Sequence, residues 1–257
     1  VVEAVAKIGE KYYATLQSAF AAAQAGETVV MLRNVTEDFA ISNTAAVTFD
    51  MAGKTLTGAI MPSTANLTVK NGTIVNNNAS YSAIEINSGS IVLNEDVKVS
   101  SVRHAIRIDG AVAATIKGGE YTLIPKSGRT HHALNVSGAA NVTIEGGKFV
   151  GPKGTASDSG SAVNVQSGAT VAISGGEFSG GKRNTLASSG TLSLTGGRYD
   201  QDVQKYCAEG YMTVKGTDGW YTVVEAAAKI VETGVYYTTF DEAYTAAKTG
   251  ETIELFR

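Results

Sequence analysis

The stretch at residues 170–178, "TVAISGGEF", decides the fold, because close variants of it recur along the chain. The variants are "NLTVKNGTI" at 66–74, "AATIKGGEY" at 113–121, "NVTIEGGKF" at 141–149 and "TLSLTGGRY" at 191–199. A second family interleaves with the first and comprises "SAIEINSGS" at 82–90, "HAIRIDGAV" at 104–112, "HALNVSGAA" at 132–140 and "SAVNVQSGA" at 161–169. Units that recur every 20 to 30 residues or so are typical of solenoids and arrays.

Apolar and polar residues alternate in each unit, which predicts short strands with one buried face. Strands this short are not stable alone, so each coil must stack on the next. In such a stack the large apolar residue after each turn is expected to point inside. We call the resulting column the core ladder, and it consists of Ile74, Tyr121, Phe149, Phe178 and Tyr199. The pattern predicts an all-β fold, a right-handed parallel β-helix. An antiparallel sandwich is the alternative, but it does not explain near-identical units.

Residues 91–112 lack the glycine pair and are expected to form a coil with a different turn. An N-terminal capping helix is predicted at 15–25, with Thr15 as N-cap and Gly26 as the C-terminal stop. Its apolar face consists of Leu16, Ala19, Phe20 and Ala23. A helical turn at 202–207 and a hairpin made of "YMTV" and "WYTV" are expected to close the other end.

The beginning of the chain recurs at its end. The stretch "VVEAVAKI" at 1–8 returns as "VVEAAAKI" at 223–230, and "ATLQSAFAAAQAGETVVMLR" at 14–33 returns as "TTFDEAYTAAKTGETIELFR" at 238–257. Thr239 and Glu242 form a capping box. We therefore predict a complete β-helix module with its caps at 1–222, and the lid helix and first strand of a next tandem module at 223–257.

Composition limits the possible partners. The formal net charge of −3 gives no general attraction to nucleic acid or anionic lipid. The single cysteine, Cys207, excludes an internal disulfide and a multi-cysteine metal site. No apolar run approaches membrane-spanning length. Neither a cofactor nor membrane insertion is expected.

The chain resembles the tandem right-handed β-helix domains, of the pectate-lyase-like kind, in large secreted surface proteins of Gram-positive, gut-type bacteria. The resemblance is carried by "AKIGEKYYATLQSAFAAAQAGETVVMLRNVTED", "VTFDMAGKTLTG", the "ISGGEF" turns and "GGRYDQDVQKYCAEGYMTVKGTDGWYTVV". It implies an extracellular, cell-surface location and an adhesin or binding module. It also implies a host partner, for which an immunoglobulin variable domain is one candidate.

An enzyme of this fold needs carboxylates on neighbouring coils. The outward column Glu85, Arg107, Asn135 and Asn164 holds one acid, and Lys148 lies between Glu120 and Glu177 in another. We therefore expect no catalytic residues and no metal site. His104 and His132 hold the same place in adjacent coils, where a solvated pair is expected rather than a metal pair.

The coils differ mainly at one corner, where loops of variable length carry basic residues. In solenoids such a corner is often the binding side. The predicted partner-binding residues are Tyr81, Arg103, His104, Lys126, Arg129, His131, His132, Lys153, Lys182 and Arg183. The competing surface is the strand face that carries Glu85 and Arg107. Three roles stay open, namely a host-protein-binding module, a carbohydrate-binding module and a structural spacer, and no catalytic function is expected.

Overall fold

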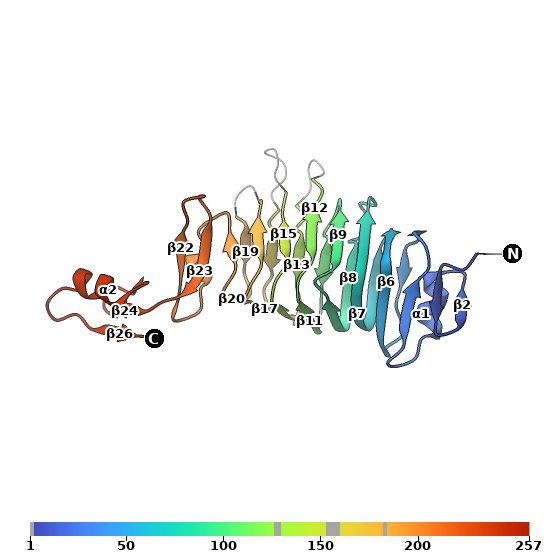
Figure 1. The fold of residues 1–257 in the computed structure, drawn as a ribbon, viewed down its shortest axis with the longest axis horizontal. Helices are drawn as coiled ribbons and strands as arrows, with labels where there is room; N and C mark the ends of the chain where they lie inside the picture. Colours follow the sequence, from blue (N-terminus) through green and yellow to red (C-terminus); the bar gives the residue numbers. More distant parts are fainter. Residues whose placement is uncertain (1–2, 126–129, 153–159, 182–183, 257) are drawn as a thin grey trace.

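The computed structural model describes residues 3–125, 130–152, 160–181 and 184–256. These residues are mostly β-strand with two short helices, which confirms the all-β prediction. One large, mostly parallel sheet contains 23 strands, which follow one another along the long axis of the molecule (Figure 1). A separate three-stranded sheet lies at the C-terminal end.

Most of the large sheet consists of three ladders of parallel strands, and we call one passage of the chain through them a rung. The first ladder contains β5 (Phe39–Ala40), the beginnings of β7 (Ile60–Asn76) and β8 (Ile84–Leu93), then β10 (Ile106–Ile108), β13 (Leu134–Val136), β16 (Val163–Val165) and β19 (Leu186–Ser188). The second contains β3 (Thr28–Met31), β6 (Ala46–Thr57), the middle of β7, the end of β8, then β11 (Val112–Ile116), β14 (Asn141–Ile144), β17 (Thr170–Ile173) and β20 (Thr191–Leu194). The third contains β4 (Val35–Thr36), the ends of β6 and β7, then β9 (Val97–Ser101), β12 (Glu120–Leu123), β15 (Lys148–Val150), β18 (Glu177–Ser179) and β21 (Arg198–Tyr199).

The register places equivalent repeat positions side by side, so the predicted core ladder is confirmed. The rings of Tyr121, Phe149, Phe178 and Tyr199 are buried and stack with centroids 4.9, 5.0 and 4.9 Å apart. Both tyrosine hydroxyls donate to carbonyls of their own turns, so neither hydroxyl is left unsatisfied inside. Val99 of β9 continues this ladder between Tyr121 and Ile74, which confirms that residues 91–112 take part in the stack.

The glycine pairs allow the rungs to approach closely at the turns. Gly176 has φ +106°, and a Cβ atom there would lie 2.8 Å from the carbonyl oxygen of Gly147 in the preceding rung. Any other residue would be strained in this conformation and would push the rungs apart. The repeated Gly-Gly therefore serves both the turn and the stacking distance.

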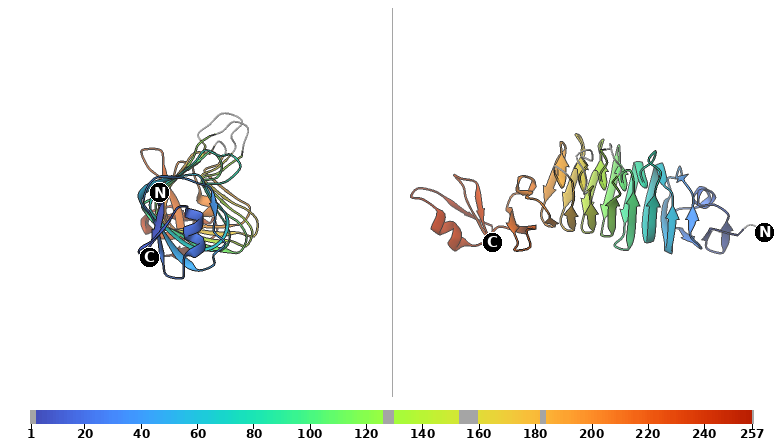
Figure 2. Two further views of the ribbon diagram at one scale, coloured as in Figure 1. Left: turned by 90° about the vertical axis from the view of Figure 1, so that its right-hand side faces the viewer. Right: turned by 90° about the horizontal axis from the view of Figure 1, so that it is seen from above.

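The N-terminal end of the sheet is covered by β1 (Ala6–Ile8), β2 (Lys11–Tyr13) and α1 (Leu16–Ala22), as the view along the molecule shows (Figure 2, left). Thr15 caps α1 as predicted, and its hydroxyl accepts from the Ser18 N–H. The helix ends at Ala22, earlier than predicted, because Ala23 is extended; Gly26 lies in the following turn with φ +83°. The side chain of Phe20 packs 5.2 Å from the rings of Phe39 and Phe49.

The opposite end confirms the predicted turn and hairpin. The 3-10 helix η1 (Gln204–Tyr206) precedes β22 (Tyr211–Lys215) and β23 (Tyr221–Glu225). Because β23 pairs antiparallel with β21, the parallel third ladder ends there. The small sheet follows, with β24 (Ala228–Ile230), β25 (Val235–Tyr237), α2 (Phe240–Ala246) and β26 (Ile253–Leu255). The predicted boundary at 222/223 stays a prediction.

Candidate functional site

The predicted loop residues divide into two groups. Lys126, Arg129, Lys153, Lys182 and Arg183 lie outside the described residues. Tyr81, Arg103, His104, His131 and His132 precede strands of the first ladder, at one corner of three successive rungs. Of these described residues Tyr81 is the most exposed, with 37% of its surface accessible. Arg103 is half-buried and donates from Nη1 to the carbonyl oxygen of Ser80 at 2.6 Å.

The histidines are not the solvated pair that the sequence predicts. His104 and His132 are only 9% and 7% exposed, and their rings stack in parallel with centroids 5.5 Å apart. Nδ1 of His104 accepts from the backbone N–H of His132 at 3.0 Å, and Nδ1 of His132 accepts from the N–H of Ser161 at 2.9 Å. Each imidazole therefore joins one rung to the next, and this role excludes a proton on Nδ1.

Both imidazoles are neutral at physiological pH. Burial lowers the pKa of His104 to about 3, and the nearby His132, His131 and Arg103 act in the same direction. Burial also lowers the pKa of His132 to about 4, with His131 as a further cause. Because Nδ1 accepts in both rings, the neutral form carries its proton on Nε2. The pair therefore offers N–H donors without a positive charge.

The strand-face column is confirmed by the register, and its cation is already paired within the protein. Arg107 binds the carboxylates of Glu85 at 2.7 Å and Asp109 at 2.8 Å, so its charge is neutralised. Glu85 is buried beneath it. The column continues as Asn135, whose Oδ1 accepts from the Nδ2 of Asn164 at 2.8 Å. The next position is Ala187, where the column loses its long side chains.

A polar groove of about 430 Å³ lies where the histidine ladder meets the shortened end of this column. Its volume falls in the range of about 300–1,000 Å³ that is typical of small-molecule sites. Its described lining consists of His104, Thr130, His132, Asn135, Ser161, Asn164, Gln166, Asn184 and Ala187. Eight of these nine side chains are polar and none bears a formal charge when the histidines are neutral. The groove can exchange many hydrogen bonds with a neutral, hydroxyl-rich or amide-rich ligand.

The sequence pointed to His104, His132, Asn135 and Asn164, but to two competing surfaces rather than one. The structure brings these residues together, because the corner and the strand face share the first ladder. Gln166 and Asn184 were not predicted. Asn184 continues the column of His104, His132 and Ser161, since each stands two residues before the aligned positions Ile106, Leu134, Val163 and Leu186. Gln166 follows the other end of its strand, so only the three-dimensional stacking brings it to the same groove.

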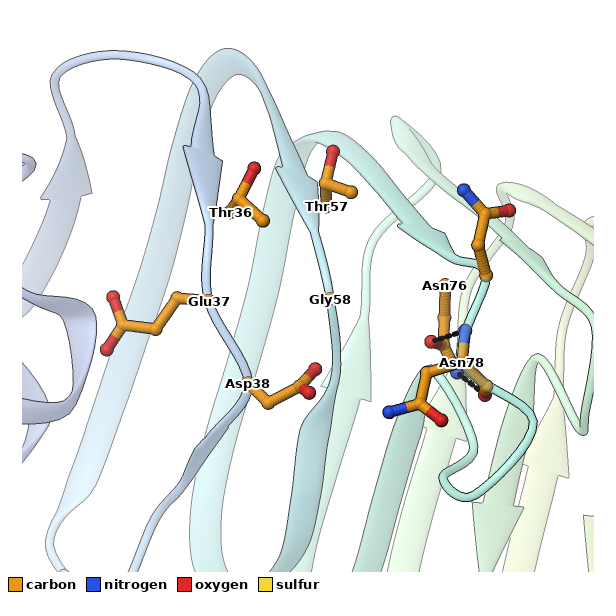
Figure 3. Close-up of a pocket in the computed structure, with 8 residues that line it drawn as sticks. Thr36, Glu37, Asp38, Thr57, Gly58, Asn76 and Asn78 are labelled. Atoms are coloured by element: carbon orange, nitrogen blue, oxygen red, sulfur yellow. Dashed lines mark hydrogen bonds between the residues drawn. The ribbon is translucent and has the colours of Figure 1, made fainter.

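A second hollow, of about 300 Å³, lies beside β4 and the end of β7 (Figure 3). Glu37 points away from it, and its carboxylate accepts from the N–H groups of Leu16 and Gln17, both at 2.9 Å. Asp38 points toward Gly58 and Asn78, while Asn76 holds its own loop by donating to the carbonyls of Asn78 and Tyr81. Of the two acids that line this hollow, Glu37 is therefore engaged by α1 and Asp38 points toward the hollow.

Acids elsewhere alternate with cations. In the third ladder Lys98 binds Glu120 at 3.2 Å, and Glu177 binds Lys148 at 3.4 Å and Arg198 at 3.1 Å. Within the ranges that the structure describes, no group of three or more His, Cys, Asp or Glu side chains could hold a metal ion. Burial raises the pKa of the free Cys207 thiol to about 11, which disfavours the reactive thiolate.

Comparisons with models of protein families, with curated proteins and with solved structures found no match for this chain. In the described part of the chain, neither helix has the length and apolar composition needed to cross a membrane.

Proposed function

We propose that the large sheet is a right-handed parallel β-helix that serves as a non-catalytic, extracellular binding module. Each rung contributes one strand to each of three parallel ladders, which is the pairing that a β-helix requires. The surface location rests on the resemblance of the chain to tandem β-helix domains of Gram-positive, gut-type bacterial surface proteins. A structural spacer is the competing role, and it requires no groove.

The groove is the proposed ligand site, and a neutral glycan is the ligand class that it fits best. The observation that carries this proposal is the uncharged lining, in which amides, hydroxyls and imidazole N–H groups converge. Sugar hydroxyls both donate and accept, so they match amide side chains such as those of Gln166 and Asn184. An acidic glycan would find no cation among the described lining residues, because the histidines stay neutral.

A host protein, including an immunoglobulin variable domain, is the second candidate. Tyr81 favours it, because an exposed tyrosine at the rim of a polar corner is typical of protein interfaces. The basic residues Arg129, Lys153 and Arg183 belong to this proposal through the sequence alone. Replacing these three residues by alanine should weaken the binding of a protein partner and leave glycan binding unchanged.

The experiment compares the chain with the double variant Gln166→Ala/Asn184→Ala on a glycan array and by calorimetry. Both residues are exposed, so the variant should fold normally, as circular dichroism would show. Loss of two to four hydrogen bonds should weaken glycan binding by about 1–3 kcal/mol. Asn141→Ala is the matched control, since Asn141 is an exposed asparagine on the second ladder.

If the double variant and the Asn141→Ala control bind the glycan with equal affinity, the ligand does not bind in the groove. Exclusive binding of acidic glycans would contradict the proposed ligand class. Binding of immunoglobulin that survives the double variant but is lost on substitution of Arg129, Lys153 and Arg183 would favour the second candidate.

A further inference from the structure

The C-terminal unit is a structural duplicate of the unit that covers the N-terminal end of the large sheet. Strand β24 pairs antiparallel with β25 and β26, as β1 does with β2 and β3. The register is the same, since Ala228 lies opposite Tyr237 as Ala6 lies opposite Tyr13. Helix α2 also has the length and the threonine N-cap of α1.

The two units differ in what covers them. Leu16 and Phe20 of α1 are 0% and 1% exposed, whereas their equivalents Phe240 and Tyr244 of α2 are 47% and 70% exposed. The strand shows the same contrast, because Met31 is 1% exposed and its equivalent Leu255 is 59% exposed. Ala243 is fully buried like Ala19, so α2 is packed on its own sheet. Phe240, Tyr244 and Leu255 define what we call the open lid face.

The covered copy shows which groups belong on this face. In the N-terminal unit, the rung that follows β3 places Phe39 and Phe49 against Phe20, and β6 pairs with β3 in parallel. The same rung supplies Glu37, which accepts from the first two N–H groups of α1. Within the described residues, β26 pairs with β24 alone, and no side chain accepts from the N–H groups of Phe240 and Asp241.

We propose that the open lid face is a docking surface for the first rung of a further parallel-strand stack, one that presents two phenylalanine rings and a free strand edge as residues 35–57 do. A second copy of this chain is a poorer occupant, because its corresponding rung is already covered by its own α1. The proposal is independent of the groove and its ligand.

The test is a tandem chain in which residues 34–225, which end with β23, follow Arg257 a second time, so that α2 and Tyr244 occur once; it is compared with the 257-residue chain. Nitration of Tyr244 by tetranitromethane should be at least tenfold slower in the tandem chain. Hydrogen exchange over residues 240–246 should slow in parallel. Tyr12 is the matched control, because it is 60% exposed and lies on the covered unit away from the docked rung; its reactivity should not change.

A variant distinguishes docking on the open lid face from a general stabilisation of the tandem chain. Tyr244→Ser in the tandem chain should return exchange over residues 240–246 to the rate seen in the shorter chain, and Tyr12→Ser should not. The proposal is overturned if Tyr244 of the folded tandem chain reacts as fast as before, or if the added rungs do not fold. Protection of Tyr244 in the 257-residue chain that grows with protein concentration would assign the face to a second copy and would also overturn it.

Discussion

The buried histidine ladder predicts that acid destabilises the protein well above the pH at which carboxylates titrate. The native pKa values of His104 and His132 are lowered to about 3 and about 4, whereas an unfolded histidine titrates at about 6.5. Between these values the unfolded chain binds more protons than the native protein. The free energy of unfolding therefore falls as the pH falls below 6.5.

The magnitude follows from the two shifts. Each histidine contributes about 1.4 kcal/mol per pH unit in the window between its native and unfolded pKa values. At pH 4.5, two units below the unfolded pKa, each costs about 2.7 kcal/mol, so the pair costs about 5 kcal/mol. This is a large share of the roughly 5–15 kcal/mol that stabilises a typical domain.

Urea denaturation at pH 7.5, 6.5, 5.5 and 4.5 measures the effect. The variant His104→Asn/His132→Asn is the comparison, because asparagine Oδ1 can accept the same backbone N–H as Nδ1 and does not titrate. His131 is retained in both proteins. The slope against pH should be smaller in the variant by about 2–3 kcal/mol per unit below pH 6. Parallel slopes in the two proteins would refute the neutral, backbone-linked ladder.

Three further predictions follow from the same packing. Replacing Phe149 by alanine should lower the free energy of unfolding, measured by urea denaturation, by about 3–5 kcal/mol, because it opens a cavity between two stacked rings. The control Ile124→Ala, at a 36% exposed site, should lower it much less, and similar losses at the two sites would contradict the core ladder. Glu37→Ala should lower the free energy of unfolding by about 1–3 kcal/mol and speed hydrogen exchange in α1, because two helix N–H groups lose a charged acceptor. Unchanged protection of the Leu16 N–H would contradict this prediction. EDTA should leave the melting temperature unchanged, as no metal cluster occurs among the described residues, and a shift of several degrees would reveal a bound cation.

The core was predictable because its signal is carried by identical residues in register. The glycine pair and the aromatic residue after it occur in the same order in four units, those at 113–121, 141–149, 170–178 and 191–199, so Phe149 and Phe178 could be placed on one ladder. Val99 was harder to place, because its rung has no glycine pair and no aromatic residue. The register shows that it takes the same inward position as Tyr121.

The site was only half predictable, for two physical reasons. The burial of His104 and His132 depends on backbone N–H groups of the next rung, and sequence spacing does not show which ring nitrogen accepts them. The groove is also built across columns, with Gln166 and Asn184 contributed by different rungs and different strand positions. The five loop residues Lys126, Arg129, Lys153, Lys182 and Arg183 stay predictions from sequence alone.

The two α-helices show how little of burial is encoded within a single segment. Leu16 and Phe240 occupy the same position after the same threonine cap, and both precede a buried alanine one turn later. Their local structures agree, because capping and strand pairing act over a few residues. Their exposures differ because the cover comes from the following rung, which supplies Phe39 and Phe49 to one unit only. In a stack of rungs each element is completed by its neighbour, so the covered copy, rather than the composition of the uncovered one, shows which groups fit this kind of surface.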